Sequence, residues 1–308
     1  MRTKTFAKAV SIFLLALFAS VIIGIFAIIP TAAVPTITLL LSMVAVGMVK
    51  PSAKMSSVVI MHSALADHSA RAEVVSGGTK ISEGGVIDYI DFQVNCGVLD
   101  TDVPTGGLVE LENDSLDWRP FEFYTQKGEL LTTTGYVQKV MRVPVKKTLP
   151  SDSIIHVYYT ARNAATDALM VTVHWVIGGR AGKETFSISG ADTAFAATAF
   201  AWNSAVITLS IPSLKGGRAV LFMGVLLDSP ETAVMSGYAV RLRNNKATWE
   251  PTEGVTEGIT GKTTASGCQM PWSINLDHPL PANSDVYVDV KAVDNQSQGL
   301  QCQLLWEV

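Results

Sequence analysis

One phrase of the sequence is written twice. Residues 109–120 read VELENDSLDWRP and residues 240–251 read VRLRNNKATWEP, which gives the shared pattern V-x-L-x-N-x-x-x-x-W-x-P at a spacing of 131 positions. In the ungapped alignment of residues 107–177 with 238–308, 17 of 71 pairs are identical, whereas unrelated sequences of ordinary composition agree at roughly one position in fifteen. Self-similarity at a fixed period indicates an internal repeat. We therefore expect two tandem copies of one fold.

The alternation of apolar and polar residues in each copy is typical of half-buried β-strands. In the segment GLVELEN, residues 107–113, Val109 and Leu111 fall on one face, and Glu110 and Glu112 on the other. Turn signals separate such runs, and no long helical pattern follows residue 55. The strands are predicted near residues 56–62, 85–95, 107–113, 120–125, 137–145, 153–161 and 168–177, and again near 204–211, 218–227, 238–244, 269–276, 284–292 and 299–307.

This density of short strands predicts an all-β fold of two tandem antiparallel β-sandwiches that are jelly-roll-like. We expect an apolar segment over residues 1–54, a first sandwich over 55–179, and a second sandwich over 180–308 that repeats the first. Each copy has enough residues to bury its own core. The residues expected to form the repeated core are Trp118, Pro120, Trp175, Trp249, Pro251 and Trp306.

The N-terminal segment is apolar enough to enter a membrane. A basic start, MRTKTFAK, precedes 21 uncharged residues at 9–29, and a second uncharged run follows at 36–49. About 20 apolar residues span a bilayer as a helix. Three interpretations remain open: a helical hairpin that turns at Pro30 and Pro35, a single anchor with an apolar stalk, and a cleaved signal peptide.

The charges that flank the two apolar runs predict a topology. Lysine and arginine precede the first run and follow the second, at Lys50 and Lys54, whereas the turn between the runs carries no charge. Under the positive-inside rule, a hairpin would keep both of its ends on the cytoplasmic side, and a single anchor would place the body outside. In either case we expect the lipid membrane to be a partner through residues 9–49.

The two copies differ most in their charges. Glu110 and Glu112 align with Arg241 and Arg243, and Arg119 aligns with Glu250, so the polar face changes sign while the apolar face is kept. One interpretation is that two solvated faces have drifted apart. The other is that the first copy of one subunit faces the second copy of a neighbour. On that hypothesis, all six of these residues lie at a subunit interface.

The remaining residues give no sign of catalysis. A net charge of −4 with no basic run in the body argues against nucleic-acid binding through the β domains. No nucleophile elbow or phosphate-binding loop occurs in a suitable setting, so we expect no enzyme activity, no cofactor and no metal. Cys268 and Cys302 align with apolar strand positions, and whether they form a disulfide bond is left open. Asn113 and Asn295 begin N-glycosylation tripeptides.

Tandem duplication, β-strand content and a membrane-inserting start favour a structural protein that tiles a surface. From residue 55 to residue 308 the organisation resembles the double jelly-roll capsid proteins of viruses with an internal membrane. The resemblance implies trimers with a pseudo-sixfold outline and a coat that assembles on the membrane of a virion. The alternatives are a cell-surface S-layer or filament subunit and a membrane-anchored binding module for a glycan or another protein. In the first two cases the principal partner is the chain itself, as a homo-oligomer or lattice.

Overall fold

The computed structural model separates residues 55–308 from the residues that precede them. It describes residues 54–65, 70–96, 107–125, 129–132, 135–137, 140–161, 167–196, 198, 200–227, 238–249, 253–256, 272–292 and 297–308. The predicted helix or helical hairpin of residues 1–54 falls, apart from Lys54, outside these residues, and so do Glu250, Pro251, Cys268 and Asn295. Among the described residues, no helix is long and apolar enough to cross a bilayer.

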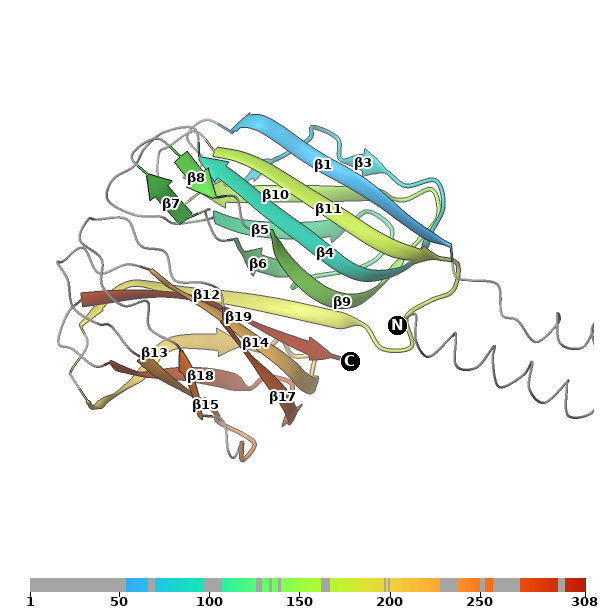
Figure 1. Cartoon of the computed structure of the whole chain (residues 1–308). Helices are drawn as coiled ribbons and strands as arrows, with labels where there is room; N and C mark the ends of the chain where they lie inside the picture. The colour runs from blue at the N-terminus through green and yellow to red at the C-terminus, as the bar shows by residue number, and fades with distance from the viewer. Residues whose placement is uncertain are drawn as a thin grey trace, which may run out of the picture. The chain divides into compact units, whose positions relative to one another are not determined.

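Strands β1 to β6 and β9 to β11 form two sheets that we name 1A and 1B (Figure 1). Sheet 1A has the order β1 (Met55–Leu65), β11 (Asp167–Ile177), β4 (Gly85–Cys96) and β9 (Met141–Leu149). Sheet 1B has the order β2 (Ala72–Glu73), β10 (Ile154–Ala161), β5 (Gly107–Asn113) and β6 (Glu122–Tyr124), and β3 (Thr79–Lys80) also pairs with β10. Strands β7 (Glu129–Thr132) and β8 (Gly135–Val137) pair with each other.

Strands β12 to β19 form two more sheets, 2A and 2B. Sheet 2A has the order β12 (Thr185–Ala196), β19 (Ser297–Glu307), β14 (Gly217–Leu227) and β17 (Trp272–Leu280). Sheet 2B has the order β13 (Trp202–Ser210), β18 (Asp285–Ala292), β15 (Tyr238–Asn244) and β16 (Glu253–Thr256). All the pairings within the four sheets are antiparallel, so the predicted all-β antiparallel fold is confirmed.

Each pair of sheets encloses its own apolar core. The first core joins side chains of sheets 1A and 1B, including Trp118 and Trp175. The second joins side chains of sheets 2A and 2B, including Trp249 and Trp306. These four indole rings are 5% exposed or less, and burial of rings of this size is a large source of stability. We refer to the two pairs of sheets as the first and second sandwich.

The tryptophans hold the same place in both sandwiches. The ring nitrogen of Trp118 donates to the carbonyl of Thr148 at 3.2 Å, and that of Trp249 donates to the carbonyl of Pro279 at 2.8 Å. Both bonds span 30 positions, and their partners are again 131 residues apart. The sequence repeat therefore corresponds to a repeat of hydrogen-bonding geometry.

A polar turn is also built twice. The side-chain amide of Asn113 donates to Ser153 Oγ, and that of Asn244 donates to Ser284 Oγ, at 3.0 and 2.9 Å. The residue before each serine is in the left-handed region, with φ of 58° at Asp152 and 53° at Asn283. Asp and Asn tolerate this region better than most residues do. Asn113 is only 8% exposed and its amide is used in this turn, which argues against glycosylation there.

The strands match the sequence predictions unevenly. Strands β5 and β15 begin and end where alternation places them, whereas β9 and β17 lie about four residues beyond their predicted positions. Strands β12 and β16 were not predicted at all. The sequence of β12 does alternate, as TFSIS at residues 185–189, but Thr185, Phe186 and Ser187 are all buried, on both faces of the strand.

One core position is filled differently in the two sandwiches. Strands β1 and β12 occupy the same place, and their pairing registers make Ile60 the equivalent of Gly190. Ile60 is 2% exposed in the first core. A Cβ added to Gly190 would lie 2.5 Å from Ile207 Cγ2 and 2.7 Å from Leu209 Cδ2. In the first sandwich this space is filled by Ile60. In the second sandwich it is filled by side chains of the opposite sheet, Ile207 and Leu209.

We predict that Trp118→Ala and Trp249→Ala each lower the free energy of unfolding by about 3–5 kcal/mol, the usual cost of deleting a large buried aromatic ring. Urea denaturation followed by fluorescence and circular dichroism would measure this. Leu214→Ala is the control, because this side chain is 87% exposed and its loss should change stability by less than about 0.5 kcal/mol. Wild-type stability in either tryptophan variant would contradict the prediction.

Candidate functional site

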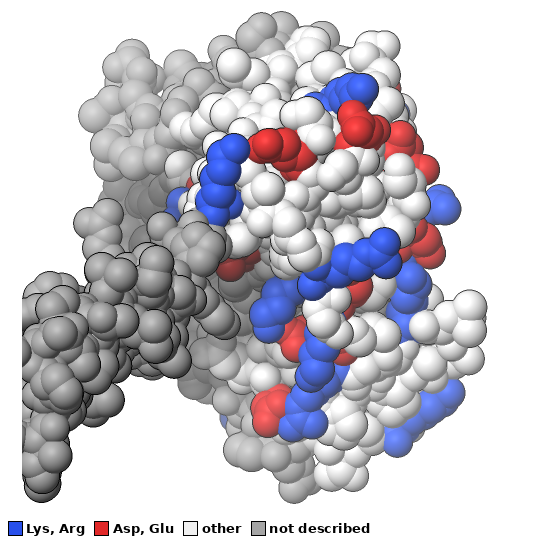
Figure 2. All heavy atoms as spheres, turned by 90° about the vertical axis from the view of Figure 1, so that its right-hand side faces the viewer, with Lys and Arg blue, Asp and Glu red and all other residues white. Residues whose placement is uncertain are grey.

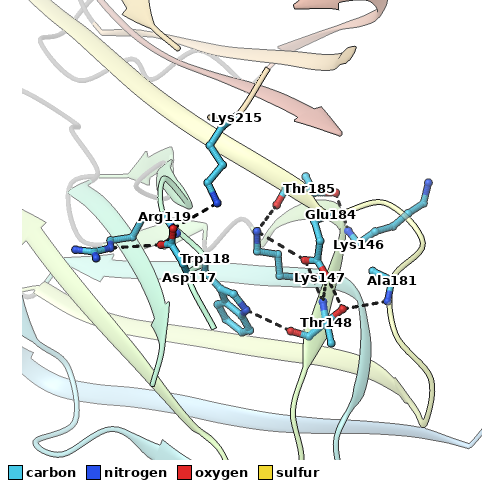
Figure 3. A network of polar contacts seen from close by, with 10 residues as sticks. All are labelled: Asp117, Trp118, Arg119, Lys146, Lys147, Thr148, Ala181, Glu184, Thr185 and Lys215. Atoms are coloured by element: carbon cyan, nitrogen blue, oxygen red, sulfur yellow. Dashed lines mark hydrogen bonds and ion pairs between the residues drawn. The ribbon is translucent and has the colours of Figure 1, made fainter. Parts of the chain in front are cut away.

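A network of polar contacts joins the two sandwiches (Figure 3). The first sandwich contributes the edge strands β9 and β6, and the second contributes its edge strand β12 together with the loop that precedes it. We call this region the junction. An exposed edge strand presents unpaired N–H and C=O groups that must find partners once they are buried, and the junction supplies them.

Strand β12 meets the first sandwich through its serines. Ser187 N donates to the carbonyl of Pro120 at 3.1 Å, and Ser187 Oγ donates to the carbonyl of Glu122 at 2.7 Å. Ser189 N donates to Glu122 Oε1 at 2.7 Å. Burial raises the pKa of Glu122, and the bond from Ser189 opposes that shift. Ser187 is completely buried, so these bonds replace hydration.

Strand β9 also bonds to the start of β12 and to the residue before it, and here the residues of β9 are the donors. Lys146 N donates to Thr185 Oγ1 at 2.8 Å, and Lys146 Nζ lies 2.7 Å from Glu307 Oε1. The Glu184 carboxylate accepts from Thr148 N at 3.1 Å and also from the Thr148 hydroxyl. The backbone N–H groups of Lys146 and Thr148 thus donate to the second sandwich, which lies on the outer side of β9, the edge strand of sheet 1A.

Lys147 is enclosed within the junction. Its side chain is 1% exposed, and Nζ donates to the Thr185 carbonyl at 2.9 Å and lies 3.5 Å from the centre of the Phe186 ring. Its nearest carboxylate, on Glu184, is 3.8 Å away. Burial lowers the pKa of Lys147 to about 7; Glu184 and Asp117 oppose this shift, and Lys215 adds to it. The junction therefore contains an amine that changes charge near neutral pH.

The outward face of sheet 2A is covered at the junction. Met223 and Leu305 are 9% and 1% exposed and belong to the first core, not to the second. Gln303, which is 3% exposed, accepts from Tyr124 N at 2.7 Å. Alternation along β19 puts Gln303 and Leu305 on its outward face, and the structure packs them, together with Met223 of β14, against the first sandwich.

Of the predicted interface residues, Glu110 and Glu112 lie on the outward face of sheet 1B. Both form ion pairs with Arg71 at 2.7 Å, and the Arg71 guanidinium stands over the Tyr158 ring at 3.4 Å. The two acids are thus compensated within their own sandwich. Arg71 is outside the aligned phrase, so the sequence repeat alone gave no sign of it.

Arg241 and Arg243 occupy the same place on sheet 2B. Both donate to Asp289, which is fully buried, and Arg241 also stands over the Trp202 ring at 4.4 Å. Burial acts to raise the pKa of Asp289, but the bonds from Arg243, Ala205 N and Arg241 outweigh it and leave that pKa below its usual value. Asp289 and Trp202 are 131 positions after Tyr158 and Arg71.

The sign change between the copies is therefore a permutation within each sheet face. Cation, anion and aromatic ring exchange places among four equivalent positions, and each face keeps its ion pairs. This explains the swap without a neighbouring subunit. The interface role of these four residues remains a prediction, as does that of Arg119, which is exposed and lies 3.8 Å from Asp117.

His156, His174 and Cys302 lie apart from one another in the two sandwiches. His156 lies on sheet 1B beside Glu73 at 2.6 Å, and His174 lies on sheet 1A, stacked on Tyr89. Cys302 is a free, buried thiol, and burial raises its pKa. No group of three or more potential metal ligands occurs in the described part of the chain. On the side where β1 begins, Figure 2 shows cationic and anionic side chains intermixed.

No family model and no curated protein matches the sequence. Similar solved structures include two viral major capsid proteins, as the sequence-based resemblance predicts. The major capsid protein P2 from bacteriophage PM2 is 10% identical, with a TM-score of 0.38 over 82% of this chain and 97% of that one. STIV MCP is also 10% identical, with a TM-score of 0.41 over 83% and 97%.

Another similar structure is PNGF-II, at 10% identity and a TM-score of 0.41, over 82% of this chain and 65% of that one. Scores of this size do not transfer a function from any of these three proteins. The geometry of the junction and of the strand edges must carry the functional argument.

We predict that stability rises with pH between about 7 and 9, because the unfolded chain there holds a proton on Lys147 that the folded chain has lost; at higher pH the buried Cys302 thiol, whose pKa is raised, offsets the rise. The limiting slope is about 1.4 kcal/mol per pH unit. Lys147→Met should remove this slope and leave stability at pH 6 equal or higher. Urea titrations at several pH values would measure it, with exposed Lys146→Met as the control; an unchanged slope in Lys147→Met would contradict the prediction.

We also predict that Arg241→Glu combined with Arg243→Glu destabilises the second sandwich by about 3–5 kcal/mol, since buried Asp289 loses its cations and gains two anions. Adding Asp289→Asn should recover much of the loss in thermal unfolding. Arg119→Glu, at a side chain that is 74% exposed, is the matched surface control. A double variant that melts like the wild type would show that the ion pairs contribute little.

Proposed function

We propose that this chain is a structural subunit that assembles with copies of itself into a coat on a membrane, as a virion capsid protein does. The observation that carries the proposal is the junction. It fixes two sandwiches of the same build into one two-lobed block, the form that a repeating tile requires. The proposed domains are residues 55–179 and 180–308.

Burial at the junction supports a permanent connection between the lobes. Thr185, Ser187 and Gln303 are 3% exposed or less, and each is hydrogen-bonded to the first sandwich. Separating the lobes would leave these groups to be rehydrated and would expose Met223 and Leu305 to water. A module that only binds a ligand through one lobe has no need of this connection.

The proposed membrane partner rests on the sequence of residues 9–49. Two uncharged runs end shortly before β1 begins at Met55, so a membrane attachment through them would hold the first sandwich near the lipid surface. The proposal assigns no catalysis and no cofactor to the chain. It also assigns no nucleic-acid contact to the β domains.

The full-length chain should float with lipid vesicles in a density gradient and form regular arrays or closed particles in electron micrographs. The chain without residues 1–54 should lose flotation but keep its β-sheet circular dichroism. Full-length protein that floats but stays monomeric at high surface density would contradict the coat proposal. Filaments in place of arrays would favour the filament alternative.

A further inference from the structure

The strands that form the junction have counterparts that face outward. Strand β9 corresponds to β17 at an offset of 131, since Gly85 pairs with Leu149 as Gly217 pairs with Leu280. Strand β12 corresponds to β1 at an offset of 130, since Phe186 pairs with Trp306 as Ser56 pairs with Trp175. Both counterparts are edge strands, and no described strand pairs with their outer sides.

Exposure differs sharply at these equivalent positions. On β12, Thr185 and Ser187 face outward and are 3% and 0% exposed, because the first sandwich covers them. The equivalents on β1 are Met55, which is 48% exposed, and Ser57, which is also exposed. Further along the same face of β1, Val59 and Met61 are 48% and 64% exposed. Met55 and Val59 thus lie exposed where the equivalent Thr185 and Ser189 of β12 bond to the first sandwich, whereas the equivalent of Met61, Ala191, is exposed as well.

The sheet beside β1 shows a smaller difference in the same direction. Met223 and Leu305, which are covered on sheet 2A, correspond through their strand pairings to Asp91 and His174 on sheet 1A. The side chains of Asp91 and His174 are 14% and 21% exposed. Within sheet 1A, Asp91 is held by Arg142 at 2.7 Å, so this surface is ordered without a covering partner.

Some of the residues that bond across the junction have an identical residue at the equivalent position of β1 or β16. Ser187 corresponds to Ser57, and Glu122, whose carbonyl accepts from Ser187 Oγ, corresponds to Glu253 on the edge strand β16. The match is incomplete, because Thr148 N has Pro279 as its equivalent, which lacks an N–H. Strands β1 and β16 can therefore repeat the bond from the serine hydroxyl to the glutamate carbonyl, but β17 cannot repeat every bond that β9 makes.

We propose that β17 and β16 of one copy dock on β1 of a second copy and repeat the internal junction between chains. The inference rests on the proposed function, and it names the surfaces through which the subunits meet. Such a contact is heterologous, because the two surfaces differ. It closes into a ring if the rotation allows and otherwise extends into a filament.

Disulfide trapping tests this contact in the full-length chain, in a background with Cys96→Ser and Cys268→Ser. Ser57→Cys with Glu253→Cys should give covalent dimers and higher oligomers on a non-reducing gel of membrane-assembled protein. Ser187→Cys with Glu122→Cys is the matched positive control, and it should close within one chain and yield no dimer. Thr208→Cys with Glu253→Cys is the negative control, because Thr208 is exposed on sheet 2B.

The outcomes separate the two proposals. Oligomeric ladders from Ser57→Cys with Glu253→Cys, at least tenfold stronger than from the negative control, support the edge contact. Regular arrays in micrographs without such ladders, while the positive control closes, overturn the edge contact and leave the coat function standing. The absence of both arrays and ladders overturns both proposals.

Discussion

The N–H and C=O groups of a buried edge strand need hydrogen-bond partners, and this need determines how the two sandwiches are joined. Strand β12 is the first strand of its sandwich, and it would present free polar groups to water if the sandwich stood alone. Instead Pro120 and Glu122 accept from Ser187, and the Glu122 carboxylate accepts from the backbone of Ser189. Unpaired buried donors and acceptors are costly, so the two sandwiches hold each other in place.

The junction also explains why a lysine is buried. Lys147 follows the alternation of β9 onto the interior side of the strand, where the edge of the sandwich would normally let its amine reach water. The second sandwich closes that exit, and the amine bonds to the Thr185 carbonyl and lies over the Phe186 ring. A group that would be a snorkelling surface lysine in a single sandwich becomes an interior one in the pair.

Much of the architecture could be predicted from the sequence, for a physical reason. Strands β5 and β15 have one face in the core and one in water, so alternation gives their limits, and the repeated tryptophans align because each closes the same edge of a core. The burial of the outward side chains of β12 and β19 could not be found in this way. Thr185, Ser187, Gln303 and Leu305 are covered by a partner that is distant in the sequence.

The candidate site was harder to predict than the fold. The alignment pairs Glu110 with Arg241, but their partners, Arg71 just before β2 and Asp289 on β18, lie elsewhere in the sequence and are not of the same type in the two copies. A repeat alignment compares equivalent positions one at a time. It does not reveal that charge lost at one position is regained at another position of the same surface.

Gly190 has a consequence for how a duplicated chain avoids confusion between its halves. During synthesis, two similar sequences in one polypeptide invite strand exchange and misassembly. If the first strand of the chain were to enter the second core, the isoleucine at position 60 would meet the space that Ile207 and Leu209 already fill. The second core therefore has no room for a side chain at the position of Gly190, and this steric exclusion disfavours the insertion of β1 in place of β12.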